Sequence, residues 1–208
     1  MDLRLDPLFP KRIPQDPGFP DEVRIEAFEI PFWSRKSESV SVIAPAPQTL
    51  VATALGGSAA TPADGVTGDV VRFESLAELQ AAAISKVDGK IVFIDEETIA
   101  TMDGSGYGMG VRKRSGCAQA ASDKGALACL IRSVGTQPHR MPHTGIMARD
   151  GAEGAGPAAA ISGPDADQLT RLLARGPVTV SGSHPGPRRV SRQMSISRSS
   201  GPGSSRCS

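Results

Sequence analysis

The chain has 208 residues, of which 39% are hydrophobic and only 4% are aromatic. That length suffices for one ordinary domain with extensions or for two small domains, with a core built mostly from Ala, Val, Leu and Ile. A net charge of +1 excludes a general electrostatic attraction to nucleic acid or to membranes. No apolar run approaches the roughly 18 residues needed to span a bilayer, and the proline-rich start has no apolar signal segment. We therefore expect no membrane partner and, by default, a cytoplasmic location.

Residues 1–22 are predicted to be irregular, because their prolines forbid a regular helix or a central strand. From Val23 the sequence VRIEAFEIPFW alternates apolar and polar side chains, which indicates a half-buried strand. The next predicted elements are strands over 39–45 and 50–55, a loop over 56–65 and a strand over 68–74. Ser75 and Glu78 then form a capping box that opens a short helix.

In the second half, the apolar run KIVFIDE predicts a strand over 90–96 that is buried on both faces. The segment VRKRSGCAQAASDKG predicts a helix over 111–125 that ends with Gly125 at its C′ position. The remaining predicted elements are strands over 126–135 and 157–163, a helix over 165–175 and a strand over 177–182. Strands that alternate with helices in this way indicate an α/β fold.

The cysteines are Cys117, Cys129 and Cys207, an odd number with no CxxC pair. This pattern argues against a complete disulfide framework and against a zinc knuckle. Cys117 and Cys129 lie in apolar surroundings, so we predict that both are buried as small apolar side chains.

Residues 181–208 differ in composition from the rest, with ten serines, five arginines and no acidic residue. Such a segment buries too little apolar surface to offset its ordering entropy, so we predict a disordered tail. An arginine-rich tail could bind RNA or acidic partners, and a non-functional extension is the favoured alternative.

The segment PHRMPHTG, residues 138–145, holds two of the three histidines, His139 and His143. Pro142 lies between them and is incompatible with a helix that would present both imidazoles to one metal ion. No Glu follows His139 as the zinc-binding HExxH pattern requires. We therefore predict a hydrogen-bonded loop and no metal site.

The segment DGSGYGMG could cradle a phosphate, because successive glycines expose backbone N–H groups before a predicted helix. It lacks the GKS/T ending of a P-loop and the GxGxxG spacing, so a structural loop is favoured. Its candidate residues are Asp103, Gly104, Ser105, Gly106 and Tyr107. No GxSxG motif is present, and the acidic cluster at 95–97 is interpreted as a solvated cap of a buried strand. No catalytic residue is predicted in this chain.

The segments VDGKIVFID, DGSGYG, KGALACLIRSVGT, HRMPHTG and PAAAISGPDADQL together resemble the protease-associated (PA) domain of a family of zinc peptidases. These are the co-catalytic two-zinc exopeptidases similar to carboxypeptidase Q. The resemblance covers about residues 23–180 and implies a PA-type swivelling β/β/α domain. It divides the chain into a proline-rich start (1–22), a β lead-in belonging to the peptidase domain (23–62), the PA domain (63–180) and the tail (181–208).

In such enzymes the PA domain carries no zinc ligand and covers or borders the substrate cleft. The ligands follow it in the sequence, beginning with an HxD motif, whereas this chain has no Asp or Glu after Val180. Two-metal hydrolysis needs several carboxylates and imidazoles that converge on one point. The resemblance therefore implies a non-catalytic fragment without a cofactor of its own, zinc being the metal of the parent family. A peptide substrate is expected only in the context of a catalytic domain.

Within that resemblance, His139, Arg140, His143 and Thr144 are expected to face the substrate cleft. We further hypothesise that a frameshift near residues 181–190 truncated the parent sequence and created the tail. Full-length relatives are commonly secreted or periplasmic. The alternatives are a stand-alone interaction module with a basic tail and a complete enzyme with an undetected site. Oligomeric state is not predicted.

Overall fold

The computed structural model describes residues 28–30, 33, 35, 37–147, 155–185 and 192–194. The prediction for residues 1–22 and most of the tail prediction lie outside this part of the chain. The chain divides into two units, of which one runs from Trp33 to Arg189 and the other contains the sequences on either side. In that other unit, β1 (Phe28–Ile30) and β10 (Arg192–Met194) form an antiparallel pair.

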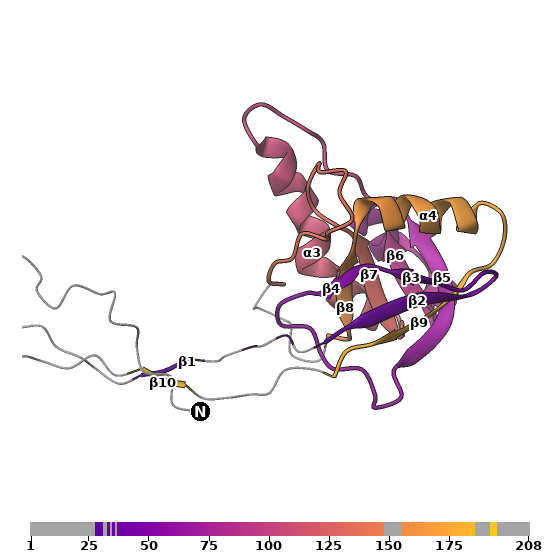
Figure 1. Ribbon diagram of the computed structural model, residues 1–208, viewed down its shortest axis with the longest axis horizontal. Helices are drawn as coiled ribbons and strands as arrows, with labels where there is room; N and C mark the ends of the chain where they lie inside the picture. The colour runs from indigo at the N-terminus through magenta and orange to yellow at the C-terminus, as the bar shows by residue number, and fades with distance from the viewer. Residues whose placement is uncertain are drawn as a thin grey trace, which may run out of the picture. The chain divides into compact units, whose positions relative to one another are not determined.

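The unit from Trp33 to Arg189 is built on an eight-stranded sheet with the order β3-β2-β9-β5-β6-β7-β8-β4 (Figure 1). Its strands are β2 (Ser39–Ala44), β3 (Gln48–Leu50), β4 (Ala52–Ala54), β5 (Val66–Phe73), β6 (Ile91–Ile94), β7 (Ala128–Arg132), β8 (Ala158–Ile161) and β9 (Thr179–Ser183). Its helices are α1 (Leu76–Ala81), α2 (Ile84–Val87), α3 (Ser105–Ser122) and α4 (Gly163–Leu173). Strands β5 to β8 are parallel neighbours, and the other pairs in this sheet are antiparallel. The prediction of an α/β fold is confirmed.

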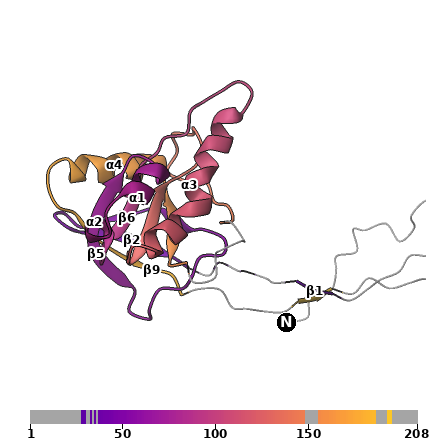
Figure 2. The same ribbon diagram turned by 180° about the vertical axis from the view of Figure 1, so that it is seen from behind.

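The core lies on both faces of the parallel strands. In β6, Val92 and Ile94 belong to one apolar cluster, and Ile91 and Phe93 belong to the other. Helices α1, α2 and α3 cover the first face, whereas α4 and the β2, β3 and β9 strands cover the second (Figures 1 and 2). All four residues of β6 are buried, as the continuous apolar run KIVFIDE predicts.

The segment 50–55, predicted as one strand, is two strands in the structure. The backbone N–H of Val51 donates to a side-chain oxygen of Asp165 at 2.8 Å, between the ends of β3 and β4. Strand β3 then pairs with β2, whereas β4 pairs with β8 at the other edge of the sheet. The apolar pattern of residues 50–55 continues without interruption, so the sequence could not reveal that the strand changes its pairing partner from β2 to β8. The strands on either side of the predicted boundary between residues 62 and 63, β2 to β4 and β5 to β9, belong to one sheet.

The predicted disordered tail begins too early in the sequence. Residues Ser181 to Ser183 complete β9, since Ser183 pairs with Ser39 of β2. Arg192–Met194 form β10, which composition alone did not indicate. The rest of the predicted tail from residue 186 onward lies outside the described residues.

Cys117 and Cys129 are buried as predicted, and they form a disulfide that the sequence analysis missed. Helix α3 packs against β7, which brings the two Cα atoms to 6.2 Å, within the usual range for a disulfide. The odd cysteine count had argued only against complete pairing. Within the described residues, no helix is long and apolar enough to cross a membrane.

Candidate functional site

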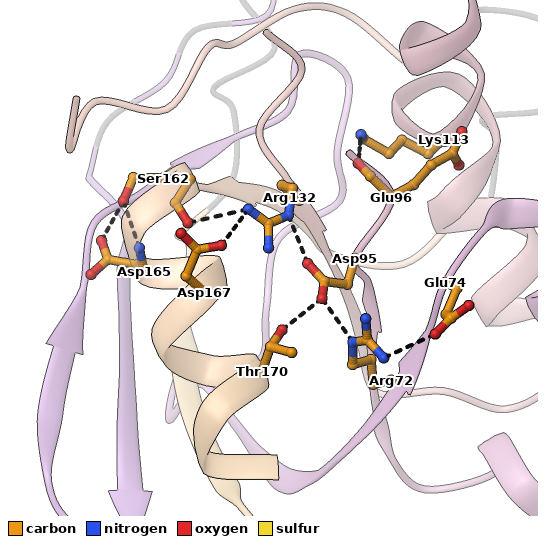
Figure 3. Close-up of polar contacts among 11 residues, drawn as sticks. Arg72, Glu74, Asp95, Glu96, Lys113, Arg132, Ser162, Asp165, Asp167 and Thr170 are labelled. Carbon is orange, nitrogen blue, oxygen red and sulfur yellow. Dashed lines mark hydrogen bonds and ion pairs between the residues drawn. The ribbon is translucent and has the colours of Figure 1, made fainter. Parts of the chain in front are cut away.

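The carboxyl ends of β5, β6 and β7 lie at one edge of the sheet, because these strands are parallel neighbours. Ligands of open α/β sheets commonly bind at this edge. Here the edge holds Asp95, whose side chain is only 3% exposed (Figure 3). Its two oxygens accept hydrogen bonds from Arg132 Nε at 2.7 Å, from Arg72 Nε at 2.7 Å and from Thr170 Oγ1 at 2.6 Å. The interpretation of residues 95–97 as a solvated cap is wrong for Asp95, which is the centre of a buried network.

Arg132 extends this network to the start of α4. Its Nη1 lies 2.8 Å from Asp167 Oδ1 and donates to the Gly163 carbonyl at 3.4 Å (Figure 3). Burial alone would lower the pKa of Arg132, but the hydrogen bonds and charges of Asp95 and Asp167 outweigh burial and raise it. The network therefore ties three parallel strands to α4 with its charges matched. Such matching indicates a structural role rather than a group free to act on a ligand.

Lys113 of α3 is a second buried charge near this edge. Its side chain is fully buried, and its Nζ donates to the backbone carbonyl of Glu96 (Figure 3). Burial lowers the pKa of Lys113 to about 8, although the charge of Glu96 opposes this shift. Lys113 was not predicted to be buried, because a lysine between Arg112 and Arg114 resembles part of an exposed basic stretch. The helical position of Lys113 on the same face as the buried Cys117 is the signal that could have found it.

The segment DGSGYGMG is mainly helix and not a loop, because α3 begins at Ser105 rather than near residue 111. Gly104 is the N-cap, with a φ of 76° that favours glycine. Asp103 Oδ1 accepts hydrogen bonds from the Ser105 backbone N–H at 3.1 Å and from the Ser105 hydroxyl at 2.8 Å. These hydrogen bonds lower the pKa of Asp103. A fixed carboxylate at the amino end of α3 opposes the binding of a phosphate there, which favours the structural interpretation.

Glycines in the first turns of α3 allow the preceding loop to pack directly on the helix. A Cβ on Gly106 would lie 1.9 Å from the carbonyl oxygen of Ile99, and one on Gly110 would lie 2.9 Å from Thr98 Oγ1. Thr101 Oγ1 also accepts a hydrogen bond from the Gly106 N–H at 3.0 Å. The glycine spacing thus serves the contact between helix and loop.

The PHRMPHTG loop, residues 138–145, is fastened at its start by Arg140. Arg140 Nε donates to both oxygens of the buried Asp165, at 2.9 and 3.1 Å, and Nη2 donates to the Thr49 carbonyl at 2.7 Å. Asp165 also accepts a 2.6 Å hydrogen bond from the hydroxyl of Ser162, the N-cap of α4. Arg140 therefore joins the loop to β3 and to the start of α4.

The second half of the loop is held by different elements. His143 Nε2 lies 3.0 Å from the Tyr107 hydroxyl, which also accepts from Arg114 Nη1 at 3.1 Å. Thr144 Oγ1 accepts from Arg35 Nη2 at 2.6 Å. The structure thus brings Tyr107 from the glycine-rich candidates together with His143 from the loop candidates.

The structure does not bring the histidines together as metal ligands. His139 is exposed, His143 contacts Tyr107, and the buried Pro142 lies between them. His184 contacts Thr61 and Trp33 instead, so the three histidines lie in different surroundings. Among the described residues, no group of three His, Cys, Asp or Glu side chains could hold a metal ion. These residues therefore do not fit a zinc centre.

Comparison with known proteins identifies relatives of most of the chain, although no protein-family model matches it. Carboxypeptidase Q of Xenopus laevis is 35% identical over 156 residues, which are 75% of this chain and 32% of that protein. The crystal structure of a peptidase M28 precursor from Shewanella amazonensis SB2B is 43% identical, with a TM-score of 0.77, over 86% of this chain and 40% of that one. A zinc aminopeptidase from Bacillus subtilis shares the fold alone, with 17% identity and a TM-score of 0.53, over 81% of this chain and 35% of that one.

Proposed function

Because most of this chain is homologous to carboxypeptidase Q and is a region related to zinc exopeptidases, we propose that it acts as the non-catalytic PA domain of such an enzyme. The chain spans about a third of the length of the curated relative, 32%, so the catalytic activity of the whole protein is itself part of the proposal. The observation that carries it is the homology over 75% of this chain. In this proposal the zinc ions and their ligands belong to the remainder of a full-length relative.

The loop at 138–145, which follows β7 at the carboxyl edge of the sheet, is proposed to border the peptide substrate. The loop at 138–145 is fixed by Arg140, His143 and Thr144, each bonded to a different part of the unit. Its His139 and Met141 side chains remain exposed, and Met141 is 70% exposed. A loop held rigidly by a scaffold, with side chains free on its outer surface, is suited to contact a substrate.

The location of the protein is also a proposal. Disulfides form and persist mainly in oxidising compartments. The Cys117–Cys129 disulfide therefore favours an oxidising compartment over the cytoplasm expected by default from the sequence.

The test exchanges the residues aligned with His139 and His143 for Ala in a full-length relative. Loss of contacts that border the substrate should raise the KM for peptide hydrolysis severalfold and leave kcat nearly unchanged. The matched control is an Ala exchange at the position of Ile84, which is exposed on α2. A KM unchanged by the histidine exchanges would count against the proposed border of the cleft.

A second assay tests the non-catalytic role. The full 208-residue chain, supplied with zinc and with unblocked and acylated dipeptides, should give no hydrolysis above the protein-free blank. Zinc-dependent release of amino acids by the purified chain would show that it is an enzyme on its own.

A further inference from the structure

A pocket lies at the other end of the sheet from Asp95, at the amino ends of β6, β7 and β8. Its empty volume is about 430 Å³, including the space at its open mouth. Its walls are mostly apolar and include Val40, Ile91, Leu130, Ala158 and Val180. The position and the lining make this pocket independent of the loops discussed above.

Among the described lining residues, His184 carries a polar side chain for which the structure shows no hydrogen-bond partner. The residue is only 5% exposed, and neither ring nitrogen has a hydrogen-bond partner among the described residues. The backbone of His184 is fixed, because its N–H donates to Thr61 Oγ1 at 3.0 Å and its carbonyl accepts from the Thr61 N–H at 2.9 Å. The ring lies against Trp33, with 6.0 Å between the ring centroids. A buried donor or acceptor without a partner is unfavourable and is rare in folded proteins, so a ligand that pairs with this imidazole would be stabilised.

The other polar groups of the lining already have partners. The hydroxyls of Ser39 and Ser183 are bonded to each other at 2.9 Å. Glu38 Oε1 accepts from the Ala54 N–H at 3.1 Å, and the Thr61 hydroxyl is engaged with the His184 backbone. A neutral imidazole offers one donor and one acceptor. A ligand that pairs with both nitrogens of this imidazole therefore needs a head group that can both donate and accept hydrogen bonds.

The charge and polarity of the pocket lining indicate which kind of ligand head group would bind. The one acid of the described lining, Glu38, is paired with Arg35, whose Nε lies 3.4 Å from Glu38 Oε1. No Lys or Arg is among the described lining residues, so an anionic head group would find no free cation in the pocket. A cationic head group would lose its hydration against apolar walls, which is costly. A neutral amide avoids both penalties and supplies N–H donors together with a carbonyl acceptor.

We propose that this pocket binds a small aliphatic primary amide. The amide hydrogen-bonds to His184, and the hydrocarbon chain packs against Val40, Ile91, Leu130 and Val180. Binding is favourable for two reasons: the imidazole gains a hydrogen-bond partner, and the hydrocarbon chain of the ligand is buried against the apolar walls. This site does not depend on the proposed peptidase context.

Trp33 makes the proposal directly testable, because it is the single tryptophan of the chain and lies against His184. Titration of the full chain with hexanamide should give a saturable change in Trp33 fluorescence, confirmed by calorimetry. Shortening the probe to pentanamide and butanamide should weaken binding about fourfold for each methylene removed, since each buried methylene contributes about 0.8 kcal/mol. Hexanoate and hexylamine should bind more weakly than hexanamide.

The matched variant is His184→Phe, which keeps an aromatic ring and removes both nitrogens. It should weaken hexanamide binding about tenfold or more, as expected for the loss of a buried hydrogen bond. Equal affinity of the variant and the native chain, absence of saturable binding, or tighter binding of hexanoate would each overturn the proposal. The probe series on the native chain decides the matter even where circular dichroism shows that the variant does not fold.

Discussion

The two ends of the eight-stranded sheet hold buried polar groups in opposite conditions. At the carboxyl ends of the parallel strands, Asp95 is bonded to Arg72, Arg132 and Thr170. At the amino ends, the imidazole of His184 is equally inaccessible to solvent and has no partner among the described residues. The hydrogen-bonding groups of Asp95 are all paired within the fold. In our proposal, those of His184 become paired only when a ligand binds.

The carboxyl edge is the usual ligand-binding edge of an α/β sheet, yet the imidazole of His184 lies at the opposite, amino end of this sheet. The carboxyl edge carries more charge, but its charges are used to join β5, β6 and β7 to α4. In the proposed function, substrate contacts at that edge are made by the exposed side chains of the loop at 138–145. At the amino end, His184 supplies the imidazole of a mostly apolar pocket, and both of its nitrogens lack a partner among the described residues. In the proposal above, a ligand uses this hydrogen-bonding capacity.

The largest effect is expected from breaking the complete network. Asp95→Asn removes the negative charge between Arg72 and Arg132 and leaves the largely buried Arg132 with the half-exposed Asp167 as its remaining acidic partner. We expect a loss of about 3–5 kcal/mol in the free energy of unfolding, measured by urea denaturation. The control is Glu97→Gln, a nearby exposed acid, which should change stability by less than about 0.5 kcal/mol. A loss below about 1 kcal/mol for Asp95→Asn would contradict the view of Asp95 as the centre of this edge.

The next effect concerns the disulfide, since Cys129 also lines the pocket at the amino end. Replacing Cys117 and Cys129 together by Ala should lower the free energy of unfolding by about 3 kcal/mol, because the closed loop of the unfolded chain is lost. Cys207→Ala is the matched control and should leave stability unchanged. In denaturant without reductant, thiol titration should detect one thiol of the three cysteines. Three reactive thiols would show that the disulfide does not form.

The third effect is a pH dependence that originates from Lys113. The folded pKa of about 8 lies below the usual value of 10.5, so between these values the unfolded chain binds more protons than the folded chain. Stability should therefore rise with pH through this window, and the cost of burying the charge is fully present below pH 8. For this lysine the rise from pH 7.5 to 9.5 is about 2 kcal/mol.

The measurement compares the free energy of unfolding of the native chain and of Lys113→Met at both pH values, so that titrations common to both cancel. Lys90→Met, a change at a partly exposed lysine, is the control and should keep the rise. A parallel pH dependence in the native chain and Lys113→Met would refute a lowered pKa for Lys113.

The sequence predicted the elements of the fold well, because most of them rest on local signals. The run KIVFIDE and the helix cap at Ser75 are each fixed within a few residues, and the structure confirms both. The predicted end of α3 is displaced, because Asp123 is its C-cap and Gly125, which has a positive φ, lies two residues beyond that cap. In contrast, the change of strand partner at Val51 occurs where its N–H donates to Asp165, which lies 114 residues away in the sequence. Local alternation holds no information about such a contact.

The candidate site was harder to predict for the same reason. The sequence did not reveal that Arg140, which was expected to face a cleft, also bonds to Asp165. Asp95 was expected to be solvated, although two arginines surround it. The partners of both side chains come from strands and helices distant in the sequence. His184 was seen only as part of a serine-rich segment, because its burial depends on its contact with Thr61 and Trp33.

The smallest effect separates the two ends of the sheet most directly. His184→Phe, without any ligand, should leave the free energy of unfolding unchanged or raise it by about 1 kcal/mol, because the variant removes unpaired polar atoms and keeps a ring against Trp33. Urea denaturation of this variant beside Asp95→Asn gives the comparison. A loss of more than about 2 kcal/mol in His184→Phe would mean that the imidazole already has a partner within the protein. Both ends of the sheet would then be closed polar networks, and the amino end would have no hydrogen-bonding capacity left for a ligand.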